Sequence, residues 1–274
     1  MGVRIQKIGM VAFFHQQLKS FKIDIHRNAN MEKQKKAPVF GDLNVKIFAD
    51  GADLDSIIDA YDKKIVKGFT TNPTLMAKAG ITNYMAFAIE VLRVVRDLPV
   101  SFEVFSDDIP GMKRQALKLN ELGPNVYIKI PITNTKGISS APLIHELACQ
   151  GLKLNITAIM TPEQVKQVAG ALKPDVPSIV SVFAGRIADS GLDPLPIMKQ
   201  SLLILKPLPS AELLWASPRE VLNIVQASDI GCHIITVTPE LLAKSVNLGK
   251  DLEVFSLDTV KMFYNDAVKS GFTI

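Results

Sequence analysis

A lysine stands inside an apolar, strand-like segment of this sequence. Lys129 lies in the run YIKIP at 127–131, whose β-prone residues predict a short buried strand. Lysine is seldom buried unless it is paired, so two interpretations are open. In the first, Lys129 closes a buried ion pair or extends its amine to solvent at the strand end. The segment alone favours this interpretation, because structural ion pairs also shift the pKa of lysines. Alternatively, desolvation favours its neutral form and makes it a nucleophilic amine that forms a Schiff base with a carbonyl substrate.

Other polar residues stand at or near the ends of similar apolar runs. They are two acids and several amide or hydroxyl residues: Asp50, Thr70, Asn72, Glu103, Asn155, Thr157, Ser181 and Ser217. Taken singly, each is more often a helix cap or a turn residue. Gathered around a buried lysine, they favour a Schiff-base aldolase or transferase in which the acids move protons.

The elements that would gather these residues follow a regular pattern. Eight apolar runs, read as strands, occupy 45–50, 64–70, 99–105, 126–131, 152–157, 178–183, 212–217 and 233–238. The segments between them have room for helices, and several carry helix-start signals, at Asp53, Pro73, Thr161, Ser217 and Thr238. This α/β alternation predicts a (β/α)8 TIM barrel, whose active site lies at the C-terminal ends of the strands. The competing doubly wound sheet lacks its G-x-G-x-x-G turn after the first strand. Residues 251–270 predict one more helix, which closes the barrel or packs on a neighbour.

Composition and charge exclude several other classes of protein. The chain has 274 residues, 47% of them hydrophobic, enough for one large domain. Residues 1–40 carry eight Lys/Arg against two Asp/Glu, a net +6, and the other residues carry 23 against 25, a net −2. The basic excess is therefore confined to residues 1–40 and predicts no nucleic-acid surface. No apolar stretch is long enough to span a membrane. Cys149, Cys232 and four scattered histidines form no metal motif. We expect a cytoplasmic protein with a flexible extension at 1–43 and a barrel catalytic domain at 44–274.

Five motifs in the body of the chain resemble those of the transaldolase family. They are FADGAD (48–53), FTTNPT (69–74), YIKIP (127–131), LNIT (154–157) and VFAGRI (182–187). The chain is similar to the compact members, which include short transaldolases and fructose-6-phosphate aldolases. The resemblance implies a class I aldolase-type barrel that needs no cofactor and no metal.

The resemblance also implies roles for individual residues. Lys129 would be the Schiff-base lysine and Asp50 the general acid and base, with Glu103 and Thr157 holding a water. Substrate binding would fall to the remaining matched residues: Thr70 and Asn72 at the ketose hydroxyls, Asn155 and Ser181 near the iminium, and Arg186 and Ser217 at the phosphate.

Two positions separate the activities within this resemblance. Glu103 and Phe183 fall where transaldolases carry glutamate and phenylalanine, and where the aldolases carry glutamine and tyrosine. An apolar ring protects a carbanion–enamine from protonation better than a phenol does, which favours a transferase. The sequence departs from the family pattern at two places. Lys136 stands where an acidic residue is common, and the loop at 216–220 is shortened, so whether Arg219 binds the phosphate stays open.

The expected function is that of a transaldolase. It would move a dihydroxyacetone unit from a ketose phosphate, sedoheptulose 7-phosphate or fructose 6-phosphate, to an aldose phosphate. The alternatives are a dihydroxyacetone-dependent aldolase of the fructose-6-phosphate type and a non-catalytic barrel that binds sugar phosphates. We expect sugar phosphates as partners, no nucleic acid, no membrane, and a homo-oligomer.

Overall fold

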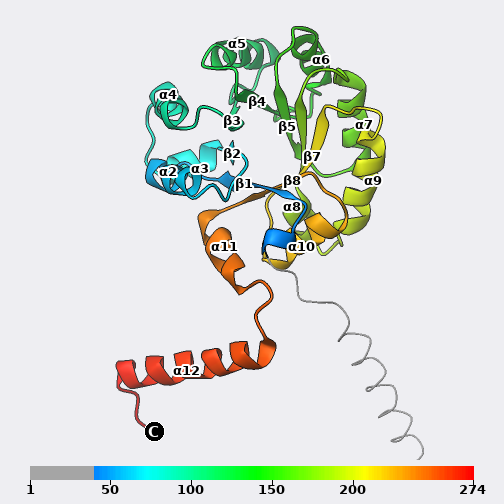
Figure 1. Ribbon diagram of the computed structural model, residues 1–274. Helices are drawn as coiled ribbons and strands as arrows, with labels where there is room; N and C mark the ends of the chain where they lie inside the picture. The colour runs from blue at the N-terminus through cyan, green and yellow to red at the C-terminus, as the bar shows by residue number, and fades with distance from the viewer. Residues whose placement is uncertain (1–39) are drawn as a thin grey trace, which may run out of the picture. The chain divides into compact units, whose positions relative to one another are not determined.

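A closed barrel of parallel strands forms the centre of the compact unit Phe40–Val246 (Figure 1). The computed structural model describes residues 40–274, and within them each strand pairs with its two sequence neighbours, β8 returning to β1. The strands are β1 (Lys46–Asp50), β2 (Phe69–Thr70), β3 (Val100–Glu103), β4 (Val126–Pro131), β5 (Leu154–Ile159), β6 (Ser178–Val182), β7 (Ala211–Trp215) and β8 (Ile234–Val237). The predicted (β/α)8 barrel is confirmed, and every predicted run overlaps its strand, although β5 extends beyond its predicted run and β7 begins one residue before it.

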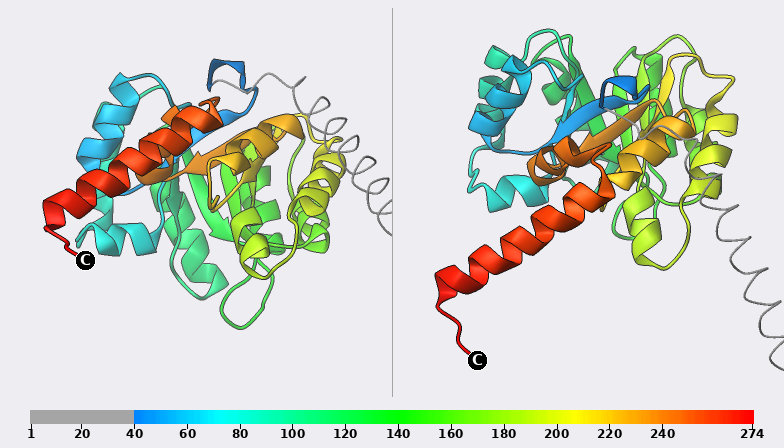
Figure 2. Two further views of the ribbon diagram at one scale, coloured as in Figure 1. Left: turned by 90° about the horizontal axis from the view of Figure 1, so that it is seen from below. Right: turned by 60° about the horizontal axis from the view of Figure 1, so that its bottom comes forward.

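Helices surround the strands on the outside of the barrel (Figure 2). They are α2 (Leu54–Asp62), α3 (Pro73–Lys78), α4 (Tyr84–Val94), α5 (Ile109–Asn120), α6 (Ala141–Cys149), α7 (Pro162–Ala171), α8 (Ala184–Asp189), α9 (Leu195–Leu205), α10 (Leu222–Asp229) and α11 (Pro239–Lys244), with 3-10 turns η1 (Phe40–Asp42) and η2 (Ser245–Asn247).

Most of the predicted helix starts are confirmed by side-chain caps. The side chains of Asp53, Thr161 and Thr238 accept hydrogen bonds from the first turns of α2, α7 and α11. Pro73 is the first residue of α3 and follows its cap, Asn72. The start predicted at Ser217 is wrong. Helix α10 begins only at Leu222, and Ser217 adopts a left-handed conformation with φ of 60° in the preceding loop.

The strands separate two apolar layers, because successive side chains point to opposite faces of a strand. Outward-facing residues such as Ile128, Ile156 and Trp215 pack in the main core with the helices. A second cluster of buried residues comes from the alternate positions of the strands: Phe48, Ile179, Leu214, Ala216 and Ile234. A Cβ at Gly68 would lie 2.5 Å from the Phe48 ring, so any other residue there would require this ring to move. These apolar side chains fill the barrel interior beneath the polar strand ends.

The compact unit that contains the barrel runs from Phe40 to Val246, and residues 247–274 belong to a second unit. The described part of that second unit is mainly helix α12 (Leu252–Ser270), as predicted. The side chain of Asp251 caps its start, and Gly271, with φ of 67°, ends it. Within residues 40–274, no helix is long and apolar enough to cross a membrane. The extension predicted at 1–43 falls almost entirely on residues 1–39, which lie outside the described residues.

His233, directly before β8, makes the stability of the barrel depend on pH. Its Nδ1 accepts a hydrogen bond of 3.0 Å from the backbone N–H of Leu213, so the ring must be neutral. Burial lowers the pKa of His233, Glu212 opposes this shift, and Lys46 adds to it. The unfolded chain therefore binds the proton more readily. Stability is complete above the unfolded pKa of about 6.5 and falls as the pH drops below it.

We expect the melting temperature to fall between about pH 7.5 and 5.5, a window above the range in which unperturbed carboxylates titrate. His233→Asn keeps an acceptor oxygen but cannot be protonated, so the melting temperature should depend less on pH. His145→Asn, at an exposed position on α6, should keep the slope of the parent. Equal slopes in His233→Asn and the parent would contradict this account.

Candidate active site

A cavity of about 450 Å³ opens at the C-terminal ends of the strands. All but one of the residues predicted from the sequence line it: Asp50, Thr70, Asn72, Glu103, Lys129, Thr157, Ser181, Phe183, Arg186 and Ser217. Asn155 lies behind Ser181. The residues that sequence reasoning missed are Pro73, Thr74, Leu75, Ala158, Leu214, Ala216 and Thr236. Thr236 could have been found, because it lies two positions beyond the inward-facing Ile234 on β8.

Lys129 is buried and paired. Its side chain is 9% exposed, and its Nζ lies 3.0 Å from Oε2 of Glu103. The amine also donates a hydrogen bond of 3.1 Å to the carbonyl oxygen of Thr71. The ion pair follows from the strand register, since Glu103 on β3 and Lys129 on β4 are direct partners. The contacts of Lys129 therefore agree with the first interpretation, a buried ion pair. The pair nevertheless faces a cavity rather than a packed core, so the second interpretation stays open.

Asp50, at the end of β1, lies in the same cavity. Its Oδ1 accepts a hydrogen bond of 2.8 Å from Oγ1 of Thr70, its register partner on β2. Burial raises the pKa of Asp50 above its usual value, while Lys129 and hydrogen bonds from Thr70 and Asn72 partly oppose the shift. A carboxyl group with such a pKa accepts and returns a proton more readily than an exposed aspartate does.

A chain of hydrogen bonds crosses the barrel interior beside Lys129. Oγ of Ser181 donates to Oδ1 of Asn155 at 2.7 Å, and Nδ2 of Asn155 donates to Oγ of Ser101 at 3.0 Å. Because the bond to Ser181 fixes the amide of Asn155, the chain is held rigidly. Thr157 differs, since its buried Oγ1 has no hydrogen-bond partner among the described residues. A buried hydroxyl in this state calls for a water or a substrate atom in the cavity.

The rim of the cavity contains strained backbone and one arginine. Ala158 and Ser217 both have positive φ, 61° and 60°, although neither is glycine. Strained conformations cluster at functional sites, although Lys64, which does not line this cavity, also has a positive φ. Arg186 on α8 reaches the cavity beside Phe183, its guanidinium carbon 5.8 Å from the ring centroid. Among residues 40–274, it is the arginine that lines the cavity.

Arg219, whose role the sequence left open, is held elsewhere. Its Nε donates to Oδ1 of Asp189 at 2.9 Å, and a second guanidinium nitrogen contacts the other carboxylate oxygen. This forked pair raises the pKa of Arg219 and lowers that of Asp189. The side chain of Arg219 does not line the cavity.

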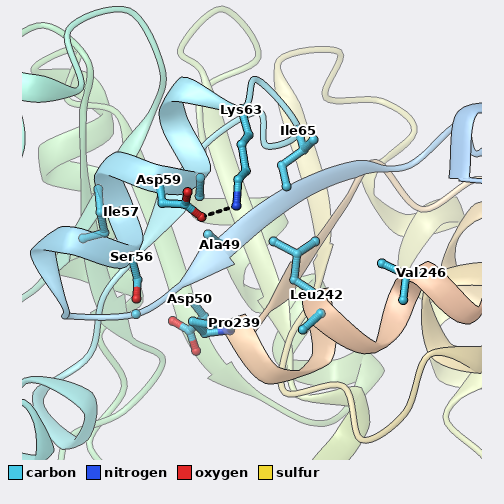
Figure 3. Close-up of a pocket in the computed structure, with 13 residues that line it drawn as sticks. Ala49, Asp50, Ser56, Ile57, Asp59, Lys63, Ile65, Pro239, Leu242 and Val246 are labelled. Atoms are coloured by element: carbon cyan, nitrogen blue, oxygen red, sulfur yellow. Dashed lines mark hydrogen bonds and ion pairs between the residues drawn. The ribbon is translucent and has the colours of Figure 1, made fainter.

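A second cavity, of about 290 Å³, lies between α2 and α11 beside the end of β1 (Figure 3). Ile57, Ala60, Leu242 and other apolar residues line much of it. Its charged lining includes Lys63 and Asp59, which pair with each other. Few polar groups converge there, so the barrel mouth is the better candidate for chemistry. Among residues 40–274, no group of three metal-ligating side chains comes together in either place.

The fold and site define a class of protein, a (β/α)8 barrel with a buried lysine and two carboxyl groups at its mouth. The family model described as "Transaldolase/Fructose-6-phosphate aldolase" matches residues 47–274. The chain therefore belongs to the transaldolase/fructose-6-phosphate aldolase family.

Individual relatives agree with this assignment. A protein of Thermoanaerobacter sp. (strain X514), named "Probable transaldolase", is 35% identical over 203 residues, which cover 74% of this chain and 89% of the relative. Another of that name, from Thermoplasma volcanium, is 34% identical and covers 80% and 96%. Among solved structures, 2,3-dimethylmalate lyase aligns with a TM-score of 0.50 at 14% identity, over 85% of this chain and 86% of that one. This last likeness shows the fold alone.

Gly185 tests how tightly the rim is packed. A Cβ at this position would lie 1.5 Å from the carbonyl oxygen of Ser217, which is backbone and cannot rotate away. Gly185→Ala should therefore lower the free energy of unfolding by about 1–3 kcal/mol, as overpacking does. Gly170→Ala in α7 is the matched control, because no atom lies within 4 Å of its Cβ. It should be neutral or slightly stabilising. Denaturant unfolding measures both, and equal effects would contradict tight packing at Gly185.

Proposed function

We propose that this chain is a transaldolase that transfers a dihydroxyacetone unit between sugar phosphates through a Schiff base on Lys129. The observation that carries the proposal is the buried Lys129–Glu103 pair facing the same cavity as Asp50. A buried ion pair made only for packing would ordinarily be closed off from solvent. Here the amine borders a space large enough for a small ligand.

Formation of the Schiff base begins at the ion pair. The Nζ of Lys129 must lose a proton before it attacks, and the Glu103 carboxylate, 3.0 Å away, is the group positioned to receive it. The amine adds to C2 of a ketose phosphate, and loss of water leaves a protonated imine. The unpartnered hydroxyl of Thr157 and the Glu103 carboxylate supply polar groups for the water that this step releases.

Cleavage of the sugar needs a base that later becomes an acid. Asp50 takes the proton of the C4 hydroxyl, the C3–C4 bond breaks, and its electrons move into the iminium to give an enamine. The aldose phosphate leaves. When a second aldose phosphate binds, the enamine carbon attacks its aldehyde, Asp50 returns the proton to the new hydroxyl, and water hydrolyses the imine. The raised pKa of Asp50 supports both directions of transfer.

The proton donors around the cavity favour transfer over simple aldol cleavage. Within the described residues, no tyrosine, histidine or cysteine lines the cavity. The nearby Tyr84 donates its hydroxyl to the carbonyl oxygen of Glu103 at 2.8 Å, and burial raises the pKa of this phenol. Phe183 and Leu214 add apolar surface. With few acids nearby, the enamine survives until an acceptor arrives.

Substrate phosphate would bind at the rim. Arg186 offers a planar, permanently charged fork that suits a phosphate dianion. Among the described residues, no carboxylate forms an ion pair with Arg186, unlike Arg219. Ser217, beside it in the lining, adds a hydroxyl. Thr70 and Asn72 would contact the ketose hydroxyls, and the rigid pair of Ser181 and Asn155 would lie near the iminium.

Borohydride reduction in the presence of fructose 6-phosphate tests the Schiff base. We expect a mass adduct on Lys129, and none in Lys129→Arg, because a guanidinium does not form the imine. Lys46→Arg, on the same barrel but in the exposed pair with Glu212, is the control and should still form the adduct.

The same preparation separates the three candidate functions. With erythrose 4-phosphate added, a transaldolase forms a transfer product and releases little dihydroxyacetone. Dihydroxyacetone as the main product would replace the proposal with the aldolase, and absence of both the adduct and turnover would leave a sugar-phosphate-binding barrel.

Asp50→Asn tests the assignment of the acid and base. The amide keeps the shape of the carboxyl group but cannot take a proton, so the adduct on Lys129 should still form. Cleavage should slow by ~10²–10⁴-fold, the share of general acid–base catalysis. Rapid-quench release of aldose phosphate measures it. A cleavage rate like that of the parent would assign the base to another residue, with Glu103 the next candidate.

A further inference from the structure

We propose that Thr236 is a positioning residue: through the hydroxyl of Thr70, it holds the carboxyl group of Asp50 in one orientation in both its ionised and its protonated form. The sequence patterns singled out Thr70 and Asp50 but not Thr236. The kinetic part of this inference rests on the proposed function, whereas its structural part concerns the resting protein.

The three side chains form one continuous chain of hydrogen bonds. Oγ1 of Thr236 lies 2.6 Å from Oγ1 of Thr70, which lies 2.8 Å from Oδ1 of Asp50. Thr70 and Thr236 are almost fully buried, 3% and 6% exposed. The residues come from β2, β8 and the strand between them, β1, which pairs with both. All three border the cavity that contains Lys129.

The number of hydroxyl protons fixes the direction of the chain. Thr70 has one proton, and when Asp50 is ionised that proton goes to the carboxylate. The short contact with Thr236 is then a hydrogen bond only if Thr236 donates to Thr70. Among the described residues, the hydroxyl of Thr236 makes no other hydrogen bond. Its proton is therefore free for this bond, and it makes Thr70 a stronger donor to Asp50.

When Asp50 takes up a proton, the same chain can run in reverse. Asp50 now donates to Thr70, and Thr70 turns its own proton toward Thr236, which accepts it. Only two hydroxyl rotations are needed, and no bond between heavy atoms breaks. The proton of Thr236 then turns toward the cavity, which Thr236 borders. The chain therefore keeps two hydrogen bonds in both states, whereas without Thr236 only the bond between Thr70 and Asp50 would remain. The chain thus serves a carboxyl group that must act first as base and then as acid.

Thr236→Val tests this inference, because it keeps the shape of the side chain and removes the hydroxyl. Thr236→Ser keeps the hydroxyl, and Ser178→Ala is the matched control. Ser178 is equally buried, and its hydroxyl donates to Val176, away from the cavity. Should Thr236→Val fail to fold, Thr236→Ala removes the same hydroxyl without adding bulk.

The first measurement is the titration of Asp50 in the resting protein, followed by the carboxyl ¹³C shift of labelled aspartate and assigned by its loss in Asp50→Asn. Removal of the Thr236 hydroxyl weakens the bond to the ionised form, so the pKa of Asp50 should rise in Thr236→Val. Thr236→Ser and Ser178→Ala should titrate like the parent. In a Thr70→Val background, Thr236→Val should add no further shift, because the link is already cut. Lys129, the charged group that acts on Asp50, and its partner Glu103 are unchanged throughout.

The second measurement is single-turnover cleavage of fructose 6-phosphate. Thr236→Val should slow it about tenfold, a part of the ~10²–10⁴-fold acid–base contribution, with KM unchanged and the acid limb of its pH profile moved upward. Thr236→Ser should restore both. The inference would be overturned if the pKa of Asp50 in Thr236→Val equalled that of the parent, or if Thr236→Ser cleaved no faster than Thr236→Val. If the parent forms no adduct on Lys129, the proposed function fails, while the titration still decides whether the chain orients Asp50.

Discussion

The buried charge of Lys129 is the constraint on which the rest of the site depends. An ammonium group with 9% of its side chain exposed is costly unless it is paired and hydrogen-bonded. Glu103 supplies the opposite charge and the Thr71 carbonyl an acceptor. Removing the Glu103 carboxylate alone would leave the charge of Lys129 buried without a partner. Removing Lys129 and Glu103 together would avoid this cost but would take away both groups of the ion pair. The carboxylate that stabilises the fold is thus the same group that receives the proton of Lys129 in the proposed reaction.

The register of the parallel strands places the residues of the site beside one another. Lys129 pairs with Glu103 on one side and with Asn155 on the other, and Asp50 pairs with Thr70. Residues two positions apart share a face, so the same strands present apolar side chains such as Phe48 and Leu214 within the barrel. Strands hold the proposed reactive groups, whereas Arg186 on helix α8 and Ser217 in the loop after β7 would meet the phosphate. The proposed chemistry and the proposed phosphate contacts therefore come from different parts of the fold.

Most of the site could be predicted from sequence because strand periodicity and the order of motifs are local signals. Eight runs predicted the barrel, and the strand ends gave Asp50, Thr70, Glu103 and Lys129. The contacts between strands could not be predicted in this way. The 2.6 Å contact of Thr236 with Thr70 depends on how far β8 is offset from β2 across β1. Likewise, the helix start expected at Ser217 failed because a close approach to Gly185, not the Ser-Pro signal, decides the backbone there.

The two carboxyl groups in the cavity have different neighbours, which suits the different roles proposed for them. Glu103 is in direct contact with a cation, which holds it in an ion pair until Lys129 gives up its proton. Asp50 has hydroxyl and amide donors as its nearest partners and feels Lys129 only as a more distant charge, so burial dominates and raises its pKa. In the proposed reaction, the group that contacts the lysine is thus distinct from the group that exchanges protons with the sugar. By the proposed mechanism, a barrel with Lys129 and Glu103 but without the hydroxyls around Asp50 would still form the imine, yet Asp50 would take and return the proton of the sugar more slowly.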